Sequence, residues 1–332
     1  VARLQRALIW AAGCGGAIVM IEPSPYEIAT LAGIIFFYAT GLRLRPVFLP
    51  LLFLLVVMNF GYTICSAYLM DNSKIVNWII TSWYMAVTAI FFAAGLSDDP
   101  EARLDVLRRG LIVGAVIASL AGLIGYFRLL PGTFDLFTLY GRLKGTFKDP
   151  NVLGAFLILP ALFALQGLVT QSFGKSVRSA IAFGIISLAI LLAFSRASWG
   201  QLVFTSAFML LLMCMTSESR QQRNRIMLTA VAAVAAMSVL IMVLLSFDSI
   251  DSLFKERASF NQSYDGGRFG RFGRHALGFE MALDLPMGIG PLQFTRFFPE
   301  DTHNSFLNAF MSGGWIAGVC FPALLFITVA MG

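Results

Sequence analysis

Charged residues are scarce in this sequence, and their scarcity excludes an ordinary soluble domain. Asp, Glu, Lys and Arg make up 13% of the 332 residues, whereas a soluble domain carries roughly 25%. Hydrophobic residues account for 58% of the chain, and the mean hydropathy is +0.79. Most of the protein surface therefore faces something other than water.

Cysteine and histidine are also rare, and the usual metal and nucleophile motifs are missing. The four cysteines lie in apolar segments without a CxxC spacing, which favours packing over a disulfide or metal role. The sequence contains no HExxH, DxD, GxSxG, Rossmann or P-loop pattern. A metal-dependent or serine-nucleophile mechanism therefore has no support, and we expect no metal, no cofactor and no nucleic-acid partner.

What the sequence has in abundance is apolar blocks of about 20 residues, the length of helix that crosses the hydrocarbon core of a bilayer. This pattern predicts an all-α polytopic membrane protein, with residues 1–332 forming a single integral membrane domain of about ten spans. Because the chain begins with Val1 and ends at Gly332 inside an apolar run, we expect further spans beyond its ends. The predicted spans are residues 7–22, 26–41, 47–70, 75–96, 110–128, 151–172, 179–195, 198–215, 226–247 and 304–330.

Basic residues in alternate short connections predict the orientation. Lys and Arg concentrate in cytoplasmic loops of membrane proteins, so we predict a cytoplasmic N-terminus. The residues that set this direction are Arg3, Arg6, Arg43, Arg45, Arg103, Arg108, Arg109, Lys175, Arg178, Arg220, Arg223 and Arg225.

A second set of basic residues falls on the opposite, predicted periplasmic side, against the insertion bias. This side holds the two longest connections, residues 129–150 and 248–303. Long loops are translocated largely regardless of charge, but Arg196 lies in a turn of only a few residues. The members of this set are Arg142, Lys144, Lys148, Arg196, Arg268, Arg271, Arg274 and Arg296.

Arg196 is the most unusual of these residues, because a charge at the membrane rim costs about 1–3 kcal/mol unless it snorkels or pairs. It belongs to the turn Ser195-Arg196-Ala197-Ser198-Trp199. One interpretation is snorkelling to lipid headgroups beside Trp199 as an interface anchor. The other is a guanidinium that meets a lipid-linked phosphate, which its planar fork suits.

The loop before the sixth predicted span combines basic residues with a helix start. Asp149 can cap the free N–H groups of that helix, with Pro150 at its first position. Arg142, Lys144 and Lys148 surround Gly145. These three basic residues are either solvated loop residues or part of an anion site.

The long second loop holds Arg268, Arg271 and Arg274, spaced three residues apart. The segment from Ala276 onward suggests a helix, and the arginines would then share a face near its N-terminus. Positive side chains oppose the helix dipole there, which makes sense if an anion binds. A basic face touching anionic lipid is the alternative. Residues 286–290, with Pro286, Gly288 and Gly290, are expected to end this helix.

Of the two histidines, His303 lies where the long loop re-enters the membrane, and Asn304 or Ser305 could cap the final span. A neutral imidazole there could accept a proton from a hydroxyl near pH 7. The alternative is a rim histidine of no consequence. His275 is the weaker candidate, because packing alone can account for it.

These features, taken in order, resemble the O-antigen ligase and O-antigen polymerase superfamily of bacterial membrane glycan transferases. The resemblance covers residues 135–330 by motif and the earlier spans by hydropathy only. The motifs are Arg142-x-x-Gly145 with Pro150-Asn151, Ser195-Arg196-x-x-Trp199, Arg271 before Pro286-x-Gly288-x-Gly290, and His303-Asn304-Ser305-Phe306-Leu307 with Gly313-Gly314.

The resemblance implies a GT-C-like helical fold and metal-independent transfer of a glycan from undecaprenyl diphosphate at the periplasmic face of the bacterial inner membrane. It implies that Arg196 and Arg271 bind the diphosphate, that Arg142 assists, and that His303 activates an acceptor hydroxyl. Arg268, Arg274 and Lys144 are possible supporting residues. The spacing to Pro286 favours Arg271 among the three arginines of the long loop, but leaves the choice open.

The expected partners are the bilayer, a lipid-linked glycan donor, and a glycan or lipid-anchored acceptor in O-antigen, capsule or exopolysaccharide synthesis. The sequence does not distinguish ligase from polymerase. Two other hypotheses are a secondary transporter or flippase for an anionic or lipid-linked substrate, and a scaffold subunit with a basic external loop. The nearly uncharged centres of the spans argue against the transporter, and Arg196 argues against the scaffold.

Overall fold

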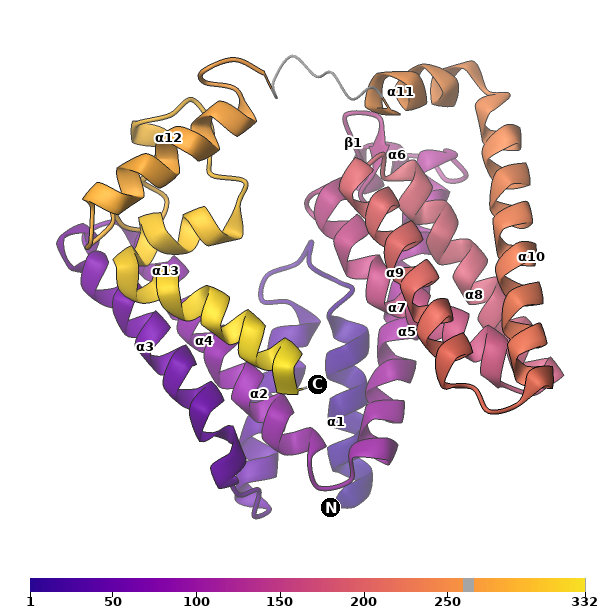
Figure 1. The fold of residues 1–332 in the computed structure, drawn as a ribbon, viewed down its shortest axis with the longest axis horizontal. Helices are drawn as coiled ribbons and strands as arrows, with labels where there is room; N and C mark the ends of the chain where they lie inside the picture. Colours follow the sequence, from indigo (N-terminus) through magenta and orange to yellow (C-terminus); the bar gives the residue numbers. More distant parts are fainter. Residues whose placement is uncertain (259–265, 332) are drawn as a thin grey trace. The chain divides into compact units, whose positions relative to one another are not determined.

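The structure is a computed structural model that describes residues 1–258 and 266–331. Figure 1 shows that nearly all regular structure in these residues is helical, which confirms the all-α prediction. Residues 259–265, within the predicted long loop, and Gly332 lie outside the described residues.

Eight helices in the described part of the chain are long and apolar enough to cross a membrane. They coincide with the last eight predicted spans, which confirms a polytopic membrane protein. Their bounds are α3 Leu49–Cys65, preceded by the 3-10 turn η1 Pro46–Phe48, α4 Ser73–Leu96, α5 Pro100–Tyr126, α7 Pro150–Thr170, α8 Phe173–Leu192, α9 Arg196–Thr216, α10 Arg220–Leu245 and α13 Ser305–Met331.

The first two predicted spans correspond to shorter helices. Helix α1 covers Ala2–Gly15 and helix α2 covers Pro25–Ala39, with 14 and 15 residues respectively. At 1.5 Å per residue each is about 22 Å long, less than the hydrocarbon thickness. Residues 16–24, which the predicted spans partly included, form the connection between them.

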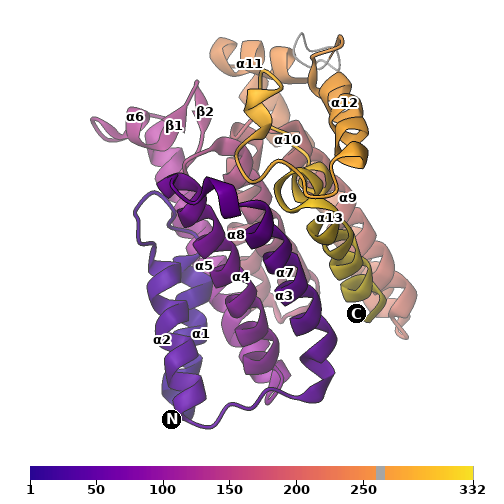
Figure 2. The ribbon, with the colours of Figure 1, turned by 90° about the vertical axis from the view of Figure 1, so that its left-hand side faces the viewer.

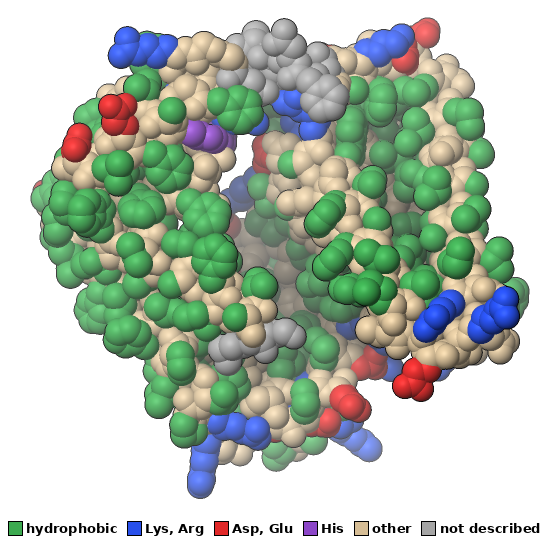
Figure 3. Space-filling model, viewed as in Figure 1, with side chains coloured by type: hydrophobic (Ala, Val, Ile, Leu, Met, Phe, Trp, Pro, Cys, Tyr) green, Lys and Arg blue, Asp and Glu red, His purple; other side chains and the backbone are tan. Residues whose placement is uncertain are grey.

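Several helices present apolar side chains outward, as lipid-facing helices do. In α9 and in α10, only 6% of the most apolar 18-residue window is buried. Figure 3 shows hydrophobic side chains exposed along the helices and Lys and Arg side chains near helix ends. Lipid solvates such a surface, so its exposure is compatible with a stable fold.

The chain divides into two compact units, which are described separately. Unit 1 comprises Val1–Phe36 and Asp99–Phe260, and unit 2 comprises Phe37–Asp98 and Asn261–Gly332. In unit 1, α1 and α5 run in the same direction and approach closely through glycines. A Cβ at Gly114 would lie 2.5 Å from the carbonyl oxygen of Cys14, and such small residues let membrane helices pack by close van der Waals contact.

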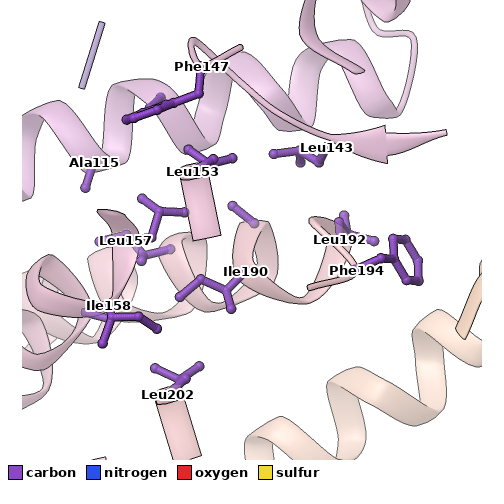
Figure 4. Packing of buried hydrophobic residues seen from close by; sticks show 14 of the residues in the cluster. Ala115, Leu143, Phe147, Leu153, Leu157, Ile158, Ile190, Leu192, Phe194 and Leu202 are labelled. Atoms are coloured by element: carbon purple, nitrogen blue, oxygen red, sulfur yellow. The ribbon is translucent and has the colours of Figure 1, made fainter. Parts of the chain in front are cut away.

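The core of unit 1 forms where α5, α7, α8 and α9 meet. Leu153, Leu157, Ile186 and Ile190 are fully buried there, and Figure 4 shows side chains from this cluster packed together. In lipid, such contacts stabilise by dispersion and tight packing rather than by removal of apolar surface from water. This core fixes the ends of α7, α8 and α9; the candidate residue Arg196 lies at the start of α9, and Arg142 contacts the ends of α7 and α8.

The connection between α5 and α7 is more ordered than the sequence predicts. It contains the short helix α6 Thr133–Phe137 and the strands β1 Thr138–Leu139 and β2 Arg142–Leu143, paired antiparallel. The two residues between the strands, Tyr140 and Gly141, have φ values of +52° and +69°. Two consecutive positive φ angles characterise the tight turn that matches strand twist, so a hairpin forms where a plain loop was expected.

The connection between α10 and α13 also contains helices. Helix α11, Asp248–Ala258, belongs to unit 1, and its Phe254 stacks on Trp199 with ring centroids 5.2 Å apart. Helix α12, Arg271–Asp284, and the 3-10 turn η3, Phe294–Arg296, belong to unit 2.

In unit 2, α3 and α4 lie side by side (Figures 1 and 2), with the turn η2 Ala67–Leu69 between them. Helix α13 packs along α3, where a Cβ on Gly61 would lie 3.0 Å from the carbonyl oxygen of Gly313. Helix α13 is interrupted at Gly313 and Gly314, whose φ and ψ angles are not helical. This interruption receives the segment that follows α12.

Candidate functional site

Arg142 is built into the scaffold of unit 1. Its side chain is buried, with the residue 8% exposed, and its Nε donates to the carbonyl oxygen of Ala193 at 2.9 Å. Its Nη2 donates to Oδ1 of Asn151 at 2.8 Å. Ala193 is the C-cap of α8 and Asn151 belongs to the first turn of α7, so Arg142 connects the hairpin to two helix ends.

Arg196 is the first residue of α9 and is partly exposed. The N-cap residue Ser195 makes no side-chain capping bond, and the first turn has no acidic residue. The first-turn N–H groups of a helix and its dipole favour an anion. The position of Arg196 therefore places a guanidinium at the end of a helix where a negative group is stabilised.

Trp199 is partly buried in unit 1, where its side chain contacts the end of α8. Its indole N–H donates to the carbonyl oxygens of Ile190 at 3.1 Å and Leu191 at 3.3 Å, at the end of α8. Its ring packs on Phe254 and faces Phe194 edge-on. Trp199 thus fixes the angle between α8 and α9, and with it the position of Arg196.

The N-terminal turns of α7 and α9 come together in unit 1. A Cβ added to Gly154 would clash with the Ser198 side chain, and the Ser198 hydroxyl donates to Oγ of Ser195 at 3.1 Å. The predicted cap of α7 is confirmed, because Oδ1 of Asp149 accepts from the N–H of Asn151 at 2.7 Å and Pro150 begins the helix.

The remaining basic residues of this loop behave differently from each other. Lys148 forms an ion pair with Glu22, which offsets its charge. Lys144 is partly exposed, and its backbone N–H donates to the carbonyl oxygen of Phe137 at 3.0 Å. Of the two lysines, Lys144 is therefore the better candidate for supporting an anion site.

Helix α12 in unit 2 begins at Arg271, five residues before the segment from which a helix was predicted. Arg271 and Arg274 lie in its first turn, but Arg268 precedes the helix and lies over the ring of Phe269 at 5.7 Å. The expectation that all three arginines share one helix face is therefore wrong for Arg268. The glycines at 266, 267 and 270 explain why the helix does not extend back to Arg268, because glycine disfavours a helix.

Arg274 is buried and paired, whereas Arg271 is partly exposed. The Arg274 side chain is 4% exposed, and its Nη2 lies 2.5 Å from Oε2 of Glu300. The buried Nε of Arg274 has no hydrogen-bond partner among the described residues. The hydrogen bond from Arg274, and then the charges of Arg274, His303 and Arg271, hold the pKa of Glu300 below its ordinary value. These four side chains therefore form one electrostatic group.

His303 is exposed and has a φ of +46°, which is unusual for a residue other than glycine. It directly precedes Asn304, whose Oδ1 accepts from the N–H groups of Phe306 and Leu307 at 3.0 and 3.1 Å. The predicted cap of the last span is confirmed for Asn304. On the other side, the carbonyl oxygen of Thr302 lies 2.7 Å from Nε2 of His275, so His275 positions the segment that carries His303.

The glycine motifs of the long loop and of α13 have a structural role together. The carbonyl oxygen of Met311, at the interruption of α13, accepts from the N–H groups of Ile289 at 2.7 Å and Gly290 at 3.1 Å. The N–H of Trp315 donates to the carbonyl oxygen of Pro286 at 2.9 Å. The predicted end of α12 is confirmed. The segment that follows it packs against the interruption of α13 so closely that a Cβ at Gly288 or Gly314 would clash with backbone atoms.

Residues 181–321 match the model of the O-antigen ligase family. The match covers 141 of the 332 residues and identifies this segment as similar to O-antigen ligases. The predicted resemblance is thereby confirmed, and the family is one of membrane enzymes that transfer glycans. No curated protein and no solved structure matches the chain.

The matched segment begins within α8 and ends within α13. It contains Arg196, Arg271 and His303, whereas Arg142 lies outside it. Reasoning from the sequence missed Glu300, because a single carboxylate in a loop gives no signal of a partner 26 residues away. Among the described residues, no group of three or more His, Cys, Asp or Glu side chains could hold a metal ion.

Proposed function

We propose that this protein transfers a glycan from undecaprenyl diphosphate to an acceptor hydroxyl at the periplasmic face of the bacterial inner membrane. It would act as a polymerase or a ligase of a surface polysaccharide. The family match supports glycan transfer in general. The choice of donor, the site residues and the side of the membrane are our proposals.

The observation that carries the mechanism is the group formed by Arg271, Arg274, Glu300 and His303 in unit 2. It combines a partly exposed guanidinium in the first turn of α12 with an exposed imidazole, and the charges of both lower the pKa of the Glu300 carboxyl, which pairs with Arg274. Guanidinium groups and helix N–H groups bind phosphate oxygens, and an imidazole can accept a proton near pH 7. A diphosphate leaving group and a hydroxyl nucleophile need these two functions.

In the proposed reaction, the acceptor oxygen attacks the anomeric carbon of the donor glycan. The bond between that carbon and the diphosphate oxygen breaks, and undecaprenyl diphosphate leaves with the electron pair. His303 takes the proton of the acceptor hydroxyl. Arg271 stabilises the negative charge that accumulates on the diphosphate, which is the electrostatic form of catalysis.

In unit 1 we assign diphosphate binding to Arg196, with Lys144 in support. Arg196 shares with Arg271 the first position of a helix without a side-chain cap. Arg142 also belongs to this proposed set, and its bonds to Ala193 and Asn151 give it a second task. It fixes the start of α7 and the end of α8. Helix α9 begins at Arg196, shortly after the end of α8, so this also helps to position Arg196.

A reconstituted assay tests the proposal. Purified protein is incubated with an undecaprenyl-diphosphate-linked glycan labelled at its non-reducing end, with and without candidate acceptors. Longer chains without added acceptor would identify a polymerase, and one glycan block on a lipid core would identify a ligase. Wild-type protein that forms no glycosidic bond with any acceptor, but moves the intact donor across vesicles, would overturn the proposal in favour of a transporter.

A further inference from the structure

Unit 1 contains a cavity that the glycan-transfer proposal does not use. It has a volume of about 480 Å³ and lies between α5, α7 and α8. Its lining includes Arg108 and Arg109 of α5, and Lys175 and Arg178 of α8, together with apolar residues such as Phe163. Basic residues from two helices thus converge on one hollow.

The charges around this cavity are only partly compensated. Asp105 pairs with both Arg108 and Arg109, so one carboxylate serves two guanidinium groups. Lys175 and Arg178 have no acidic partner within the part of the chain that the structure describes. One negative and four positive charges leave a net charge of +3, and like charges held together are unfavourable unless an anion binds between them.

The wall of the cavity is held in place by hydrogen bonds. At the turn between α7 and α8, the Ser176 hydroxyl donates to the carbonyl oxygen of Leu168 at 2.7 Å. Nη2 of Arg225, from α10, donates to the carbonyl oxygen of Gln171 at 2.6 Å. Gln171 lines the cavity, so a ligand would meet a preformed site.

The position of the cavity indicates what kind of anion it meets. Lys175 and Arg178 lie at the start of α8, and Ala193, which Arg142 contacts, lies at its end. The 20 residues of α8 span about 30 Å, the thickness of the hydrocarbon core. The cavity is therefore at the membrane rim opposite to Arg142, on the predicted cytoplasmic side. Apolar side chains are exposed on the same helix at Val177 and Ile181.

We propose that this cavity binds the phosphate headgroup of an anionic phospholipid from the cytoplasmic leaflet. Basic pockets between membrane helices on this side recognise anionic headgroups. The guanidinium and ammonium groups would contact the phosphate, and the acyl chains would lie along the exposed apolar residues of α8. The proposal is independent of the glycan-transfer reaction, because it involves none of the residues assigned to that reaction.

Native mass spectrometry of the full chain in detergent tests this site with added phosphatidylglycerol. The test variant is Lys175→Gln with Arg178→Gln, and the matched control is Arg43→Gln with Arg220→Gln. The control also removes two exposed charges from the predicted cytoplasmic side, but from outside the cavity. We expect roughly tenfold weaker binding of phosphatidylglycerol in the test variant, and unchanged binding in the control.

Two competitors complete the experiment. Phosphatidylcholine should bind the wild-type chain more weakly than phosphatidylglycerol, and inorganic phosphate should not displace the lipid at equal concentration. Equal losses in the test and control variants would overturn the proposal, because the effect would then come from surface charge in general. Displacement by equimolar inorganic phosphate would also overturn it, because the site would then take a free anion.

Discussion

Units 1 and 2 each contain one arginine at the first position of a helix and one buried arginine. Arg196 and Arg271 hold the first positions of α9 and α12, and both are partly exposed. Arg142 and Arg274 are the buried members, at 8% and 3% exposure. The two buried arginines differ in their partners.

Arg142 donates to a backbone carbonyl and a side-chain amide at the ends of two helices. Arg274 instead donates to the half-exposed carboxylate of Glu300, whose pKa is also lowered by the charge of His303. Carbonyl and amide oxygens do not titrate, but a carboxylate does. The comparison teaches that the buried arginine of unit 1 is principally a structural clamp. The buried arginine of unit 2 belongs to an electrostatic group that responds to pH.

The largest expected effect comes from the arginines at the helix starts. Arg196→Gln and Arg271→Gln should each lower the rate of glycan transfer by about 10²–10³-fold, the usual cost of losing one donor to a developing anion. The unfolding temperature should stay close to that of the wild type, because both side chains are partly exposed. The measurement is initial transfer rate together with thermal unfolding in detergent.

Arg296→Gln is the matched control, because it removes an exposed arginine from the same predicted side. It should leave the rate unchanged. A similar loss of rate in this control would mean that general surface charge, rather than a defined site, controls the reaction.

The second effect tests the clamp of unit 1. Arg142→Ala removes two hydrogen bonds from a charged donor to buried helix ends and should lower the free energy of unfolding by about 3 kcal/mol. The free energy of unfolding of Arg142→Lys should lie between those of the wild type and Arg142→Ala, because an ammonium group cannot reproduce the planar guanidinium fork. Thermal unfolding measures both variants, and wild-type stability in Arg142→Ala would contradict the structural role.

A third effect tests how unit 2 holds α12 against α13. Gly314 has a φ of +61° and a ψ of −161°, a region that is open essentially to glycine alone. Gly314→Ala should destabilise the protein by at least about 1–3 kcal/mol, because its Cβ would also clash with the carbonyl oxygen of Pro286. Gly184→Ala, where a Cβ meets open space, should not lower the unfolding temperature.

The smallest effect concerns the pH response of unit 2. Because the pKa of Glu300 is lowered in the folded protein, the stabilisation from its pair with Arg274 is complete above the ordinary pKa of a glutamate. It is lost as the pH falls through the lowered value. The effect is small because Glu300 is half-exposed.

Glu300→Gln removes this response. The difference in unfolding temperature between the wild type and Glu300→Gln should be constant from neutral pH to about pH 4.3 and shrink below it. A difference that grows on acidification would contradict the assigned sign.

The sequence predicts most of the membrane helices because a span needs about 20 apolar residues, and eight predicted spans meet that demand. Caps are also predictable, as at Asp149 and Asn304, because they depend on residues two or three positions away. The hairpin at Thr138–Leu143 was missed, because a pair of two-residue strands is too short for an alternating pattern.

The contacts of the site residues could not be predicted in the same way. Arg142 binds a backbone carbonyl 51 residues away, and every residue type offers such a carbonyl. The partner of Arg274 is a single carboxylate in a loop. Motif order identified which residues to consider, but only the fold separates the buried arginines from the partly exposed ones.

The most direct test of this account is the affinity of purified Arg196→Gln for undecaprenyl diphosphate, measured with its unfolding temperature and compared with Arg142→Ala. The account predicts that Arg196→Gln unfolds like the wild type but binds the diphosphate at least tenfold more weakly, while Arg142→Ala unfolds at a lower temperature. Wild-type affinity and wild-type transfer in a fully folded Arg196→Gln protein would contradict it.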